Sequence, residues 1–537
     1  DTLRRDHLGV YGYRRSTSPN IDAFATDAVI FDTLIPQSTW TRPSVASFMT
    51  STYPNVHGAQ RRTQPMRRDL PSLARSLALA GYETHGFVTN PNLLPEWNFG
   101  GDFDRYVDIE STLDAQNRDD AHVIDAVIET LESARGRPWY FYVHAMSPHL
   151  PYDPPDPYND RFASYPLSEW QDATVNSGFE KMENGRPVGW TSSNVAGSSW
   201  QTVLDERHGG KHAMVMRGVD ADPESSWIHM FSGPVQAGPG NTVDFALWTR
   251  ATGDPHTELV AFAQGYRDGK WIDLNGRIRV SKSPEWRYFQ YHHDVVPEGV
   301  TQVRLAVYPK HERKGVAWYL DDFRIRVNSF ESIDAAQQAY RARQIDLYDG
   351  EIAYFDDQFR LLIEALKRLD QYENTCIVLM SDHGEEFWEH GGTNHGHSLY
   401  DELLRVPCIV KLPGNDFAGA RVSEVIEMID IAPTVLEVLN VDPDVRFQGR
   451  SASGLWLGGP HVEKRAAFAA LLHEERDLSA SRTSSAKFIW NIADGSEERF
   501  DLLADPLEQS SLNTNSPIEL VDATRVAPLR DAPGLHI

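Results

Sequence analysis

A long all-β stretch interrupts a chain whose two ends alternate helices and strands. Between about Gln171 and Val327 the chain has short alternating runs, such as Thr242 to Thr249 and Gln302 to Tyr308, separated by turn residues. No amphipathic helix is predicted there. Regularly spaced short strands without helices are typical of a β-sandwich. We therefore expect an inserted all-β sandwich of the jelly-roll type.

The flanking segments show a different pattern of predicted secondary structure. Each pairs a helical apolar pattern with a short β-rich run, and this alternation is typical of α/β domains in which helices flank a parallel sheet. The predicted helices are Ser72 to Ala80, Ala121 to Ala134 and Ile333 to Leu369, and the strands that follow them are Thr84 to Val88, Trp139 to His144 and Thr375 to Met380. We predict one split α/β domain, with parts at 1–165, 329–465 and 466–537 around a sandwich at 166–328.

The charge balance limits the partners. The 537 residues include 51 Lys and Arg against 77 Asp and Glu, which gives a net charge of −26. Such a surface repels nucleic-acid phosphates and anionic lipid heads. No apolar run is long enough for a membrane-spanning helix. With two cysteines, neither a disulfide framework nor a zinc-thiolate site is expected.

The densest group of reactive side chains follows the predicted strand Thr375 to Met380. It begins Ser381-Asp382-His383-Gly384-Glu385. Residues at the carboxyl end of such a strand face the crevice in which α/β sheets bind ligands. A carboxylate beside an imidazole can bind a divalent metal, but an Asp before Gly and Glu can also simply cap a helix.

Two further groups lie near the start of the chain. Asp1 to His7 reads DTLRRDH, and Thr41-Arg42-Pro43-Ser44 precedes a predicted helix over Ser44 to Thr50. A hydroxyl at a helix entry lies in the positive field of the helix dipole, where an anion can bind. The alternative for Thr41 or Ser44 is a simple helix cap.

Together these segments strongly resemble the sulfatase family of the alkaline phosphatase superfamily. The motifs that carry the resemblance, in the family's order, are DTLRRDHLGVYGY from Asp1, TRPS from Thr41, YPNVHG from Tyr53, SPHLPY from Ser147, YDGEIAY from Tyr348, SDHGE from Ser381, DIAPT from Asp430 and DLLADP from Asp501. The sandwich resembles jelly-roll carbohydrate-binding modules. The resemblance implies an alkaline-phosphatase-like sheet flanked by helices.

The resemblance also implies a set of site residues. One divalent ion (Ca, Mn, Mg or Zn) is expected on Asp1, Thr41, Asp382 and His383, with Thr41 as nucleophile, His149 and His395 at the reacting ester, and Arg42 and His57 as substrate contacts. A structural calcium in the sandwich would use Glu180 and Asp322. In the family a strand precedes the first metal-binding Asp, so we expect further sequence, including any signal region, before Asp1. Carbohydrate-directed members are usually exported, which favours a periplasmic or secreted location.

The chain departs from the family at the nucleophile. Sulfatases carry Cys or Ser there, oxidised to formylglycine, with Arg four residues later, whereas this chain has Thr41 and Val45. Threonine cannot give that aldehyde, so no formylglycine is expected. A threonine ester must be opened by water, a step better suited to phosphoryl transfer. The modest positive charge of a one-metal site favours a monoanionic centre, either a sulfate monoester or a phosphate or phosphonate diester.

The predicted function is therefore a metal-dependent hydrolase of sulfate or phosphate and phosphonate esters, either small molecules or glycans. One alternative is a transferase that moves a phosphoglycol or phosphoethanolamine group to sugar hydroxyls. Another is a degenerate, non-catalytic glycan-binding protein. The sequence does not determine the alcohol part of the substrate, the metal or the oligomeric state.

Overall fold

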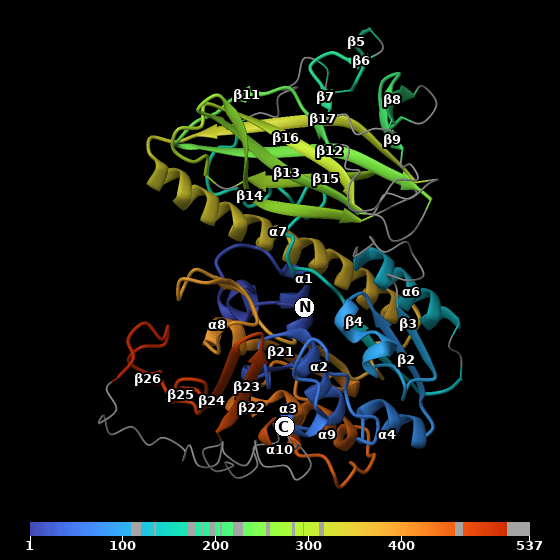
Figure 1. Cartoon of the computed structure of the whole chain (residues 1–537). Coiled ribbons are helices and arrows are strands. Elements are labelled where there is room, and N and C mark those ends of the chain that lie inside the picture. Colours follow the sequence, from blue (N-terminus) through green and yellow to red (C-terminus); the bar gives the residue numbers. More distant parts are fainter. Residues whose placement is uncertain are drawn as a thin grey trace. The chain divides into compact units, whose positions relative to one another are not determined.

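The computed structural model divides into two compact units, which are coloured by sequence in Figure 1. The structure describes residues 1–108, 120–133, 136–168, 176, 178–184, 186–192, 199–203, 207–217, 229–253, 258–281, 285–293, 295–310, 316–456 and 466–512. Among these, the first unit consists of residues within Asp1–Ile109, Asp119–Pro154 and Tyr348–Ile537, and the second of residues within Pro155–Leu347.

The first unit is an α/β unit built on a four-stranded sheet. Its strand order is β18 (Ile377–Met380), β21 (Val406–Lys411), β1 (Val29–Ile35) and β22 (Arg421–Glu427). Because β21 runs antiparallel to both β18 and β1, these two strands share one direction and their carboxyl ends lie at the same edge. The predicted parallel arrangement holds for β18, β1 and β22, whereas β21 is antiparallel, since the chain leaving β18 returns directly beside it.

A second, fully parallel sheet completes this part of the unit. Its order is β3 (Arg105–Asp108), β2 (Glu83–Val88) and β4 (Trp139–His144). The last residues of β2 and β4, Val88 and His144, are paired in register. The carboxyl ends of these strands therefore also deliver neighbouring side chains.

Helices cover both faces of the four-stranded sheet. Successive side chains of a strand point to opposite faces, and β1 accordingly places Val29 and Phe31 in one core and Ile30 in another. The first core includes residues of α2 (Thr41–Thr50), α4 (Leu73–Leu79) and α9 (Ile431–Val438). The second includes residues of α1 (Pro19–Ala25), α6 (Asp120–Ser133) and α7 (Ile333–Arg368).

The remaining elements of the first unit are short helices and an antiparallel sheet. The sheet has the order β23 (Ala467–His473), β24 (Arg476–Arg482), β25 (Ala486–Asn491) and β26 (Glu497–Asp501), and a small pair joins β19 (Glu386–Phe387) to β20 (Thr393–Asn394). The short helices are η1 (Arg5–His7), η2 (Gly9–Tyr11), α3 (Pro54–His57), η3 (Pro91–Leu93), η4 (Pro95–Trp97), α8 (Asp401–Leu404), η5 (Pro413–Asn415), η6 (Met428–Asp430) and α10 (Ser453–Trp456).

The second unit contains two antiparallel sheets that share one apolar core. One has the order β14 (Lys270–Ser281), β13 (Glu258–Arg267), β16 (Gln302–Lys310), β10 (Met230–Phe231) and β7 (Thr191–Ser192), with β11 (Val235–Gln236) also paired to β16. The other has the order β15 (Arg287–His293), β12 (Asn241–Thr252), β17 (Ala317–Ser329), β9 (Ala213–Arg217) and β8 (Ser199–Val203), and a small pair joins β5 (Met182–Glu183) to β6 (Arg186–Pro187). Two packed antiparallel sheets agree with a sandwich, whereas the jelly-roll assignment and the carbohydrate-binding-module resemblance stay predictions.

The predicted elements of the α/β part match the observed ones within a few residues. The exception is the helix predicted at Ser44, which begins at Thr41. Pro43 is tolerated in that first turn, because the first amides of a helix have no partner within the helix. The division into four segments stays a prediction, and the compact units change at Pro155 and Leu347. None of the helices in the described residues is long and apolar enough to cross a membrane.

Candidate active site

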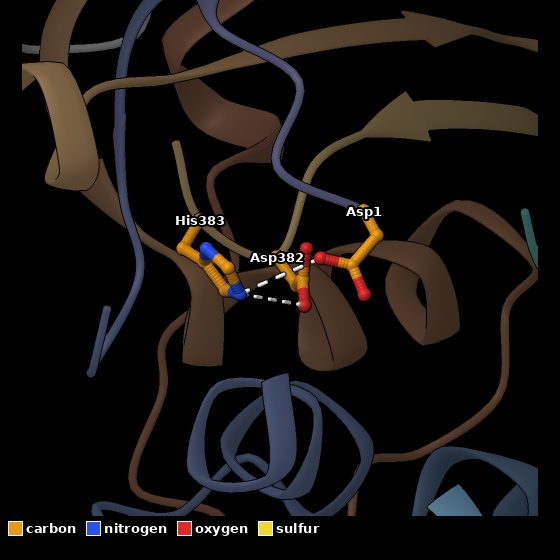
Figure 2. A group of neighbouring side chains, drawn as sticks. All are labelled: Asp1, Asp382 and His383. Carbon is orange, nitrogen blue, oxygen red and sulfur yellow. Dashed lines mark ion pairs between the residues drawn. The ribbon is translucent and has the colours of Figure 1, made fainter. Parts of the chain in front are cut away.

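The carboxyl ends of β1 and β18 bring distant parts of the chain together. Asp382 and His383 follow β18, and Thr41 opens α2 after β1. Figure 2 shows the side chains of Asp382 and His383 pointing toward that of Asp1. The Nε2 atom of His383 lies 3.5 Å from Oδ1 of Asp1, 3.4 Å from Oδ2 of Asp382 and 3.5 Å from Oγ1 of Thr41. The structure thus brings together the four side chains that were predicted to share one metal ion.

Asp1 has one well-bonded and one unbonded oxygen. Its Oδ2 accepts hydrogen bonds from Asn90 Nδ2 at 2.6 Å, His144 Nε2 at 3.1 Å and Thr41 Oγ1 at 3.3 Å. Its Oδ1 is buried and has no hydrogen-bond partner, and the same is true of Oδ2 of Asp382. A buried carboxylate oxygen without a donor is costly unless a cation compensates it.

The tautomer of His383 increases the need for a cation. Its Nδ1 lies 3.0 Å from the carbonyl oxygen of Gly384, so this nitrogen carries the proton. Burial lowers the pKa of His383 to about 4, against the opposing charge of Asp382. The imidazole is therefore neutral at pH 7, and Nε2 presents a lone pair to two carboxylate oxygens. Three acceptors converge without a donor between them.

These atoms fit a divalent metal. Asp1, Asp382 and His383 each offer one ligand atom, and these atoms lie within 4.8 Å of one another. Two carboxylates, one neutral imidazole and a hydroxyl suit Mn²⁺, Mg²⁺, Ca²⁺ or Zn²⁺ as oxygen-rich ligand sets do. The donor set does not distinguish among these ions.

The backbone beside Asp1 is strained and firmly held. Thr2 has a φ of 55°, in the left-handed region that costs a β-branched residue on the order of 1–2 kcal/mol. Its amide donates to Oδ1 of Asp382 at 3.3 Å, and its carbonyl accepts from the hydroxyl of Tyr348 at 2.7 Å. The residue that follows Asp1 is therefore bonded to Asp382, so the backbone here helps to hold the two acids beside each other.

His395 and His149 lie beside the metal-site imidazole. The ring centres of His395 and His383 are 4.5 Å apart, and those of His395 and His149 are 5.0 Å apart. Burial by itself would lower the pKa of His395, but the charge and the 3.0 Å hydrogen bond of Glu385 raise it above the usual value. The bond to Glu385 thus fixes the His395 ring at the edge of the site and favours its protonated form.

Two buried acids of helices α6 and α7 hold the segment that carries His149. The carboxylate of Asp120 accepts from the amides of Met146 and Ser147 at 2.9 and 3.2 Å. Glu351 accepts from the Ser147 hydroxyl at 2.7 Å and from the Asp153 amide at 2.9 Å. His149 therefore projects from a loop that is fixed on both sides.

The two predicted substrate contacts, Arg42 and His57, have partners within the protein. Arg42 is buried, with its guanidinium 3.7 Å from the ring centre of Trp97 and its nitrogens bonded to neighbouring loops. His57 is fully buried, and its nitrogens bond the Ser47 hydroxyl at 3.0 Å and the Ala59 amide at 3.1 Å. Both side chains support the fold around α2.

The predicted calcium ligands of the second unit have other partners. Glu180 accepts from the amides of Lys211 and His212 and pairs with His212 Nδ1 at 3.0 Å. Asp322 pairs with His208 Nδ1 at 2.8 Å. Neither acid belongs to the potential metal-binding groups found among the described residues. The structural calcium stays a prediction.

Asn90 and His144 contact the site but were not predicted from the sequence. Asn90 Nδ2 lies 3.4 Å from Thr41 Oγ1 in addition to its bond with Asp1. Asn90 follows β2 by two residues and His144 ends β4. A signal was available, since polar residues at the carboxyl ends of parallel strands meet at one edge.

Comparisons with solved structures agree with this fold. A structure of a protein in complex with its substrate D-glucosamine-2-N,6-O-disulfate superimposes with a TM-score of 0.58 at 16% identity, covering 96% of this chain and 92% of the other. The phosphonate monoester hydrolase of Agrobacterium radiobacter gives a TM-score of 0.57 at 16% identity, covering 99% and 92%.

Curated relatives are similar over shorter stretches. An arylsulfatase of Clostridium perfringens is 29% identical over 197 residues, or 35% of this chain and 40% of that protein. Arylsulfatase K of Canis lupus familiaris is 30% identical over 182 residues, or 32% and 34%. The matched stretches thus span two fifths or less of these relatives.

Family models cover far more of the chain. The model described as N-sulphoglucosamine sulphohydrolase, C-terminal, matches residues 389–525. The model described as Sulfatase matches residues 1–441, a range that includes every side chain of the metal-site group and its neighbours. The chain therefore belongs to the sulfatase family.

Proposed function

We propose that this protein is a metal-dependent ester hydrolase in which Thr41 attacks a monoanionic sulfur or phosphorus centre. The observation that carries the proposal is the position of Thr41 Oγ1, within 3.5 Å of both Asp1 Oδ2 and His383 Nε2. An attacking hydroxyl needs a nearby proton acceptor and a field that stabilises the alkoxide. The start of α2 supplies part of that field, and a divalent metal held by Asp1, Asp382 and His383 would supply the rest.

The chain's own groups account for each proton. The Thr41 hydroxyl gives its proton to Oδ2 of Asp1 as its oxygen bonds to the sulfur or phosphorus atom. The bond to the leaving alcohol breaks, and the cationic His395 protonates that alcohol. Neutral His395 then takes a proton from the water that opens the threonine ester. Thr41 regains its proton from Asp1.

We propose a transferred group with one negative charge. Glu385 raises the pKa of His395, and His149 lies beside it, but helix α2 carries Val45 at the position where the family resemblance implies an arginine. A dianionic phosphate monoester would meet two carboxylates with little compensation. We therefore assign phosphate diesters and phosphonate monoesters, both of which are monoanions, as the preferred substrates, with sulfate monoesters as the second class. The arylsulfatases and the phosphonate hydrolase to which the chain is similar represent both classes.

The alcohol part of the substrate is proposed to be a small molecule or a sugar. One structural neighbour is bound to a disulfated glucosamine, which supports a sugar alcohol. The two antiparallel sheets of the second unit are proposed to bind glycan.

The test compares matched hydroxyl deletions in helix α2. Thr41→Val should abolish turnover of aryl phosphodiesters, phosphonates and sulfates, whereas Thr41→Ser should retain part of it. Thr50→Val removes a buried hydroxyl at the other end of the same helix and serves as the control. Mass spectrometry of quenched wild-type reactions should detect the transferred group on Thr41.

Two outcomes would contradict the proposal. One is turnover by Thr41→Val that equals turnover by Thr50→Val. The other is transfer of the group to an added sugar alcohol faster than to water, which would identify a transferase instead. Selective turnover of aryl sulfate without a change at Thr41 would keep the hydrolase but reverse the assigned substrate class.

A further inference from the structure

Arg62 lies at the border of the site, on a loop that follows helix α3. Its side chain is exposed, and its Nε donates to Nε2 of His473 at 3.3 Å. The His473 ring packs against Trp40, the residue before the nucleophile, with ring centres 4.9 Å apart. A side chain added at Gly396 would meet Trp40 and His473 at 3.5 and 3.6 Å. Three distant segments thus place Arg62 next to the surroundings of Thr41 and His395.

The buried Arg42 fixes the backbone that carries Arg62. Its Nη1 donates to the carbonyls of Arg61 at 3.2 Å and Arg62 at 2.6 Å. Its Nη2 donates to Oδ1 of Asn92 at 3.1 Å, and its guanidinium stacks on Trp97. The Arg42 side chain is therefore used to hold this loop, whereas Arg62 is exposed and bonds His473.

His473 acts as a hydrogen-bond acceptor for Arg62. Burial and the charge of Arg62 lower the pKa of His473, while Glu474 and the backbone of Gly396 oppose this effect. A neutral imidazole can accept at Nε2 while its other nitrogen donates. The bond orients the guanidinium but uses only its Nε atom, so the Nη edge can bind an anion.

The charge around Arg62 lacks an internal counterion. Among the described residues no carboxylate lies within ion-pair distance of Arg62; Glu96 and Glu474 act electrostatically on its neighbours Arg42 and His473. The guanidinium of an exposed arginine matches the planar or tetrahedral oxygens of carboxylate and sulfate. Its position beside the reacting centre places such an anion on the substrate.

We propose that Arg62, held by His473 and the Arg42-bound loop, binds a second anionic group on the alcohol part of the substrate. The enzyme then prefers esters whose leaving alcohol carries a sulfate or a carboxylate of its own. The predicted substrate preference rests on the proposed function. The anion-binding subsite does not, because it can be measured by binding alone.

The kinetic test uses two aryl esters that differ only in a carboxylate on the leaving phenol. In the wild type, kcat/KM should favour the carboxylated ester. Arg62→Gln should lower the ratio of the two kcat/KM values about tenfold, through KM, because one charge-assisted contact is lost. Arg62→Lys should restore part of the ratio, and His473→Gln should lower it less. Arg61→Gln, one residue earlier in the same loop, is the control and should leave the ratio unchanged.

A binding test separates this inference from the proposed reaction. Isothermal titration calorimetry of the Thr41→Ala protein should give tighter binding of disulfated than of monosulfated glucosamine. Adding Arg62→Gln should remove most of that difference. The inference is overturned if Arg62→Gln weakens both sugars equally, or if it lowers kcat for both aryl esters alike. If the wild type shows no turnover, the proposed function is wrong. The calorimetry then still tests whether Arg62 binds the second anionic group.

Discussion

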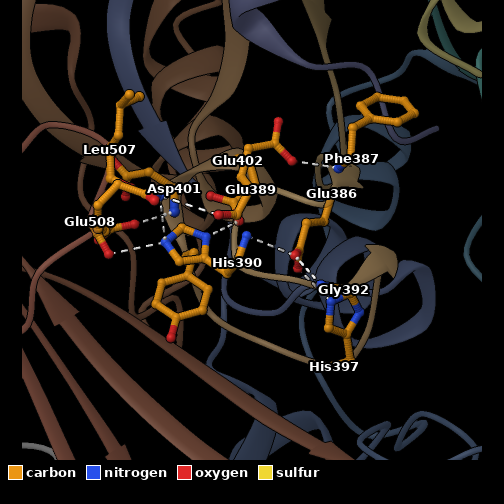
Figure 3. Close-up of polar contacts among 12 residues, drawn as sticks. Glu386, Phe387, Glu389, His390, Gly392, His397, Asp401, Glu402, Leu507 and Glu508 are labelled. Atoms are coloured by element: carbon orange, nitrogen blue, oxygen red, sulfur yellow. Dashed lines mark hydrogen bonds and ion pairs between the residues drawn. The ribbon is translucent and has the colours of Figure 1, made fainter. Parts of the chain in front are cut away.

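Two groups of acids and imidazoles in the α/β unit have the same kinds of residues at similar spacing but differ in their hydrogen bonds. Asp1, Asp382 and His383 form one group (Figure 2), and Glu386, His390 and Glu402 form the other (Figure 3). Each offers three ligand atoms within 4.8 Å of one another. The comparison shows that the closeness of the ligands does not by itself define a metal site.

The second group is already satisfied by protein donors. Oε1 of Glu386 accepts from the amides of His390 at 3.1 Å and Gly392 at 2.7 Å, and Oε2 accepts from His397 at 2.6 Å. His390 bonds Glu402 at 2.7 Å through Nδ1 and the Glu508 carbonyl at 3.0 Å through Nε2. The first group instead leaves Oδ1 of Asp1 and Oδ2 of Asp382 without donors. The first group therefore fits a bound cation, whereas the hydrogen bonds of the second group hold neighbouring segments of the fold together.

The largest expected difference is in metal content. Asp382→Asn should lower bound metal after dialysis to near zero and lower turnover by roughly a thousandfold, because one of two metal-site carboxylates is lost. Glu402→Gln is the matched change in the second group and should leave both quantities near the wild-type level. Metal analysis and steady-state kinetics measure the two effects. Loss of metal in Glu402→Gln would show that the second group also contributes to metal binding, which would contradict the prediction.

Thermal stability should separate the two groups in a second way. A divalent metal at about 100 times its Kd should stabilise the wild type by about 2.7 kcal/mol, or a few degrees in Tm. Asp382→Asn should remove this shift, because a neutral amide oxygen binds a divalent cation more weakly than a carboxylate. Calorimetry with and without chelator gives the comparison. A metal-induced shift in Asp382→Asn as large as that of the wild type would contradict the role of Asp382 as a metal ligand.

The pH dependence of stability should carry the signature of the second group. Burial by itself would lower the pKa of His390, but its bond to Glu402 raises that pKa to about 9. A raised folded-state pKa gives stability that is complete below the unfolded value of about 6.5 and is lost as the pH rises through about 9.

The difference in unfolding free energy between wild type and His390→Gln should therefore fall between pH 6.5 and 10. We expect a fall on the order of 1 kcal/mol, since His390 is partly solvated. Denaturant titrations at several pH values measure it. A difference that is constant across this range would mean that His390 is neutral in the folded protein.

The sequence predicted where the first group lies but not how its oxygens are bonded. Asp382 and His383 follow a strand that the apolar run Thr375 to Met380 makes recognisable, so their place at a sheet edge was predictable. Which carboxylate oxygens have a donor depends on remote segments, such as Asn90, which bonds Oδ2 of Asp1 and leaves Oδ1 without a donor. No local pattern reports such contacts.

Two differences between the sequence-based expectations and the structure have related causes. Arg42 and His57 were expected at the substrate because they lie near Thr41 in the sequence, but a helix turns successive side chains through about 100°. Arg42 consequently points to Trp97 and its neighbouring loop, whereas Arg62, from a different loop, reaches the border of the site. The reversed strand β21 was missed because strand direction depends on the chain path and not on composition.

The smallest predicted effect concerns Tyr142, which holds the imidazole that bonds Asp1. The Tyr142 hydroxyl lies 3.0 Å from Nδ1 of His144, and Nε2 of His144 bonds Asp1. Burial lowers the pKa of His144 to about 4, so its neutral ring must place the single proton on Nε2 to donate to the carboxylate. The tyrosine hydroxyl donates to Nδ1 and fixes that tautomer. Tyr142 is thus a positioning residue.

Tyr142→Phe removes one neutral hydrogen bond and should lower kcat roughly fivefold, since such a bond is worth about 1 kcal/mol. KM should stay within twofold, because the phenol does not touch the substrate, and metal affinity should fall slightly. Tyr140→Phe, two residues earlier on β4, is the control for lost ring polarity. If both variants lose the same activity, the effect belongs to packing. If only KM rises in Tyr142→Phe, the hydroxyl acts on the substrate and not on the orientation of Asp1.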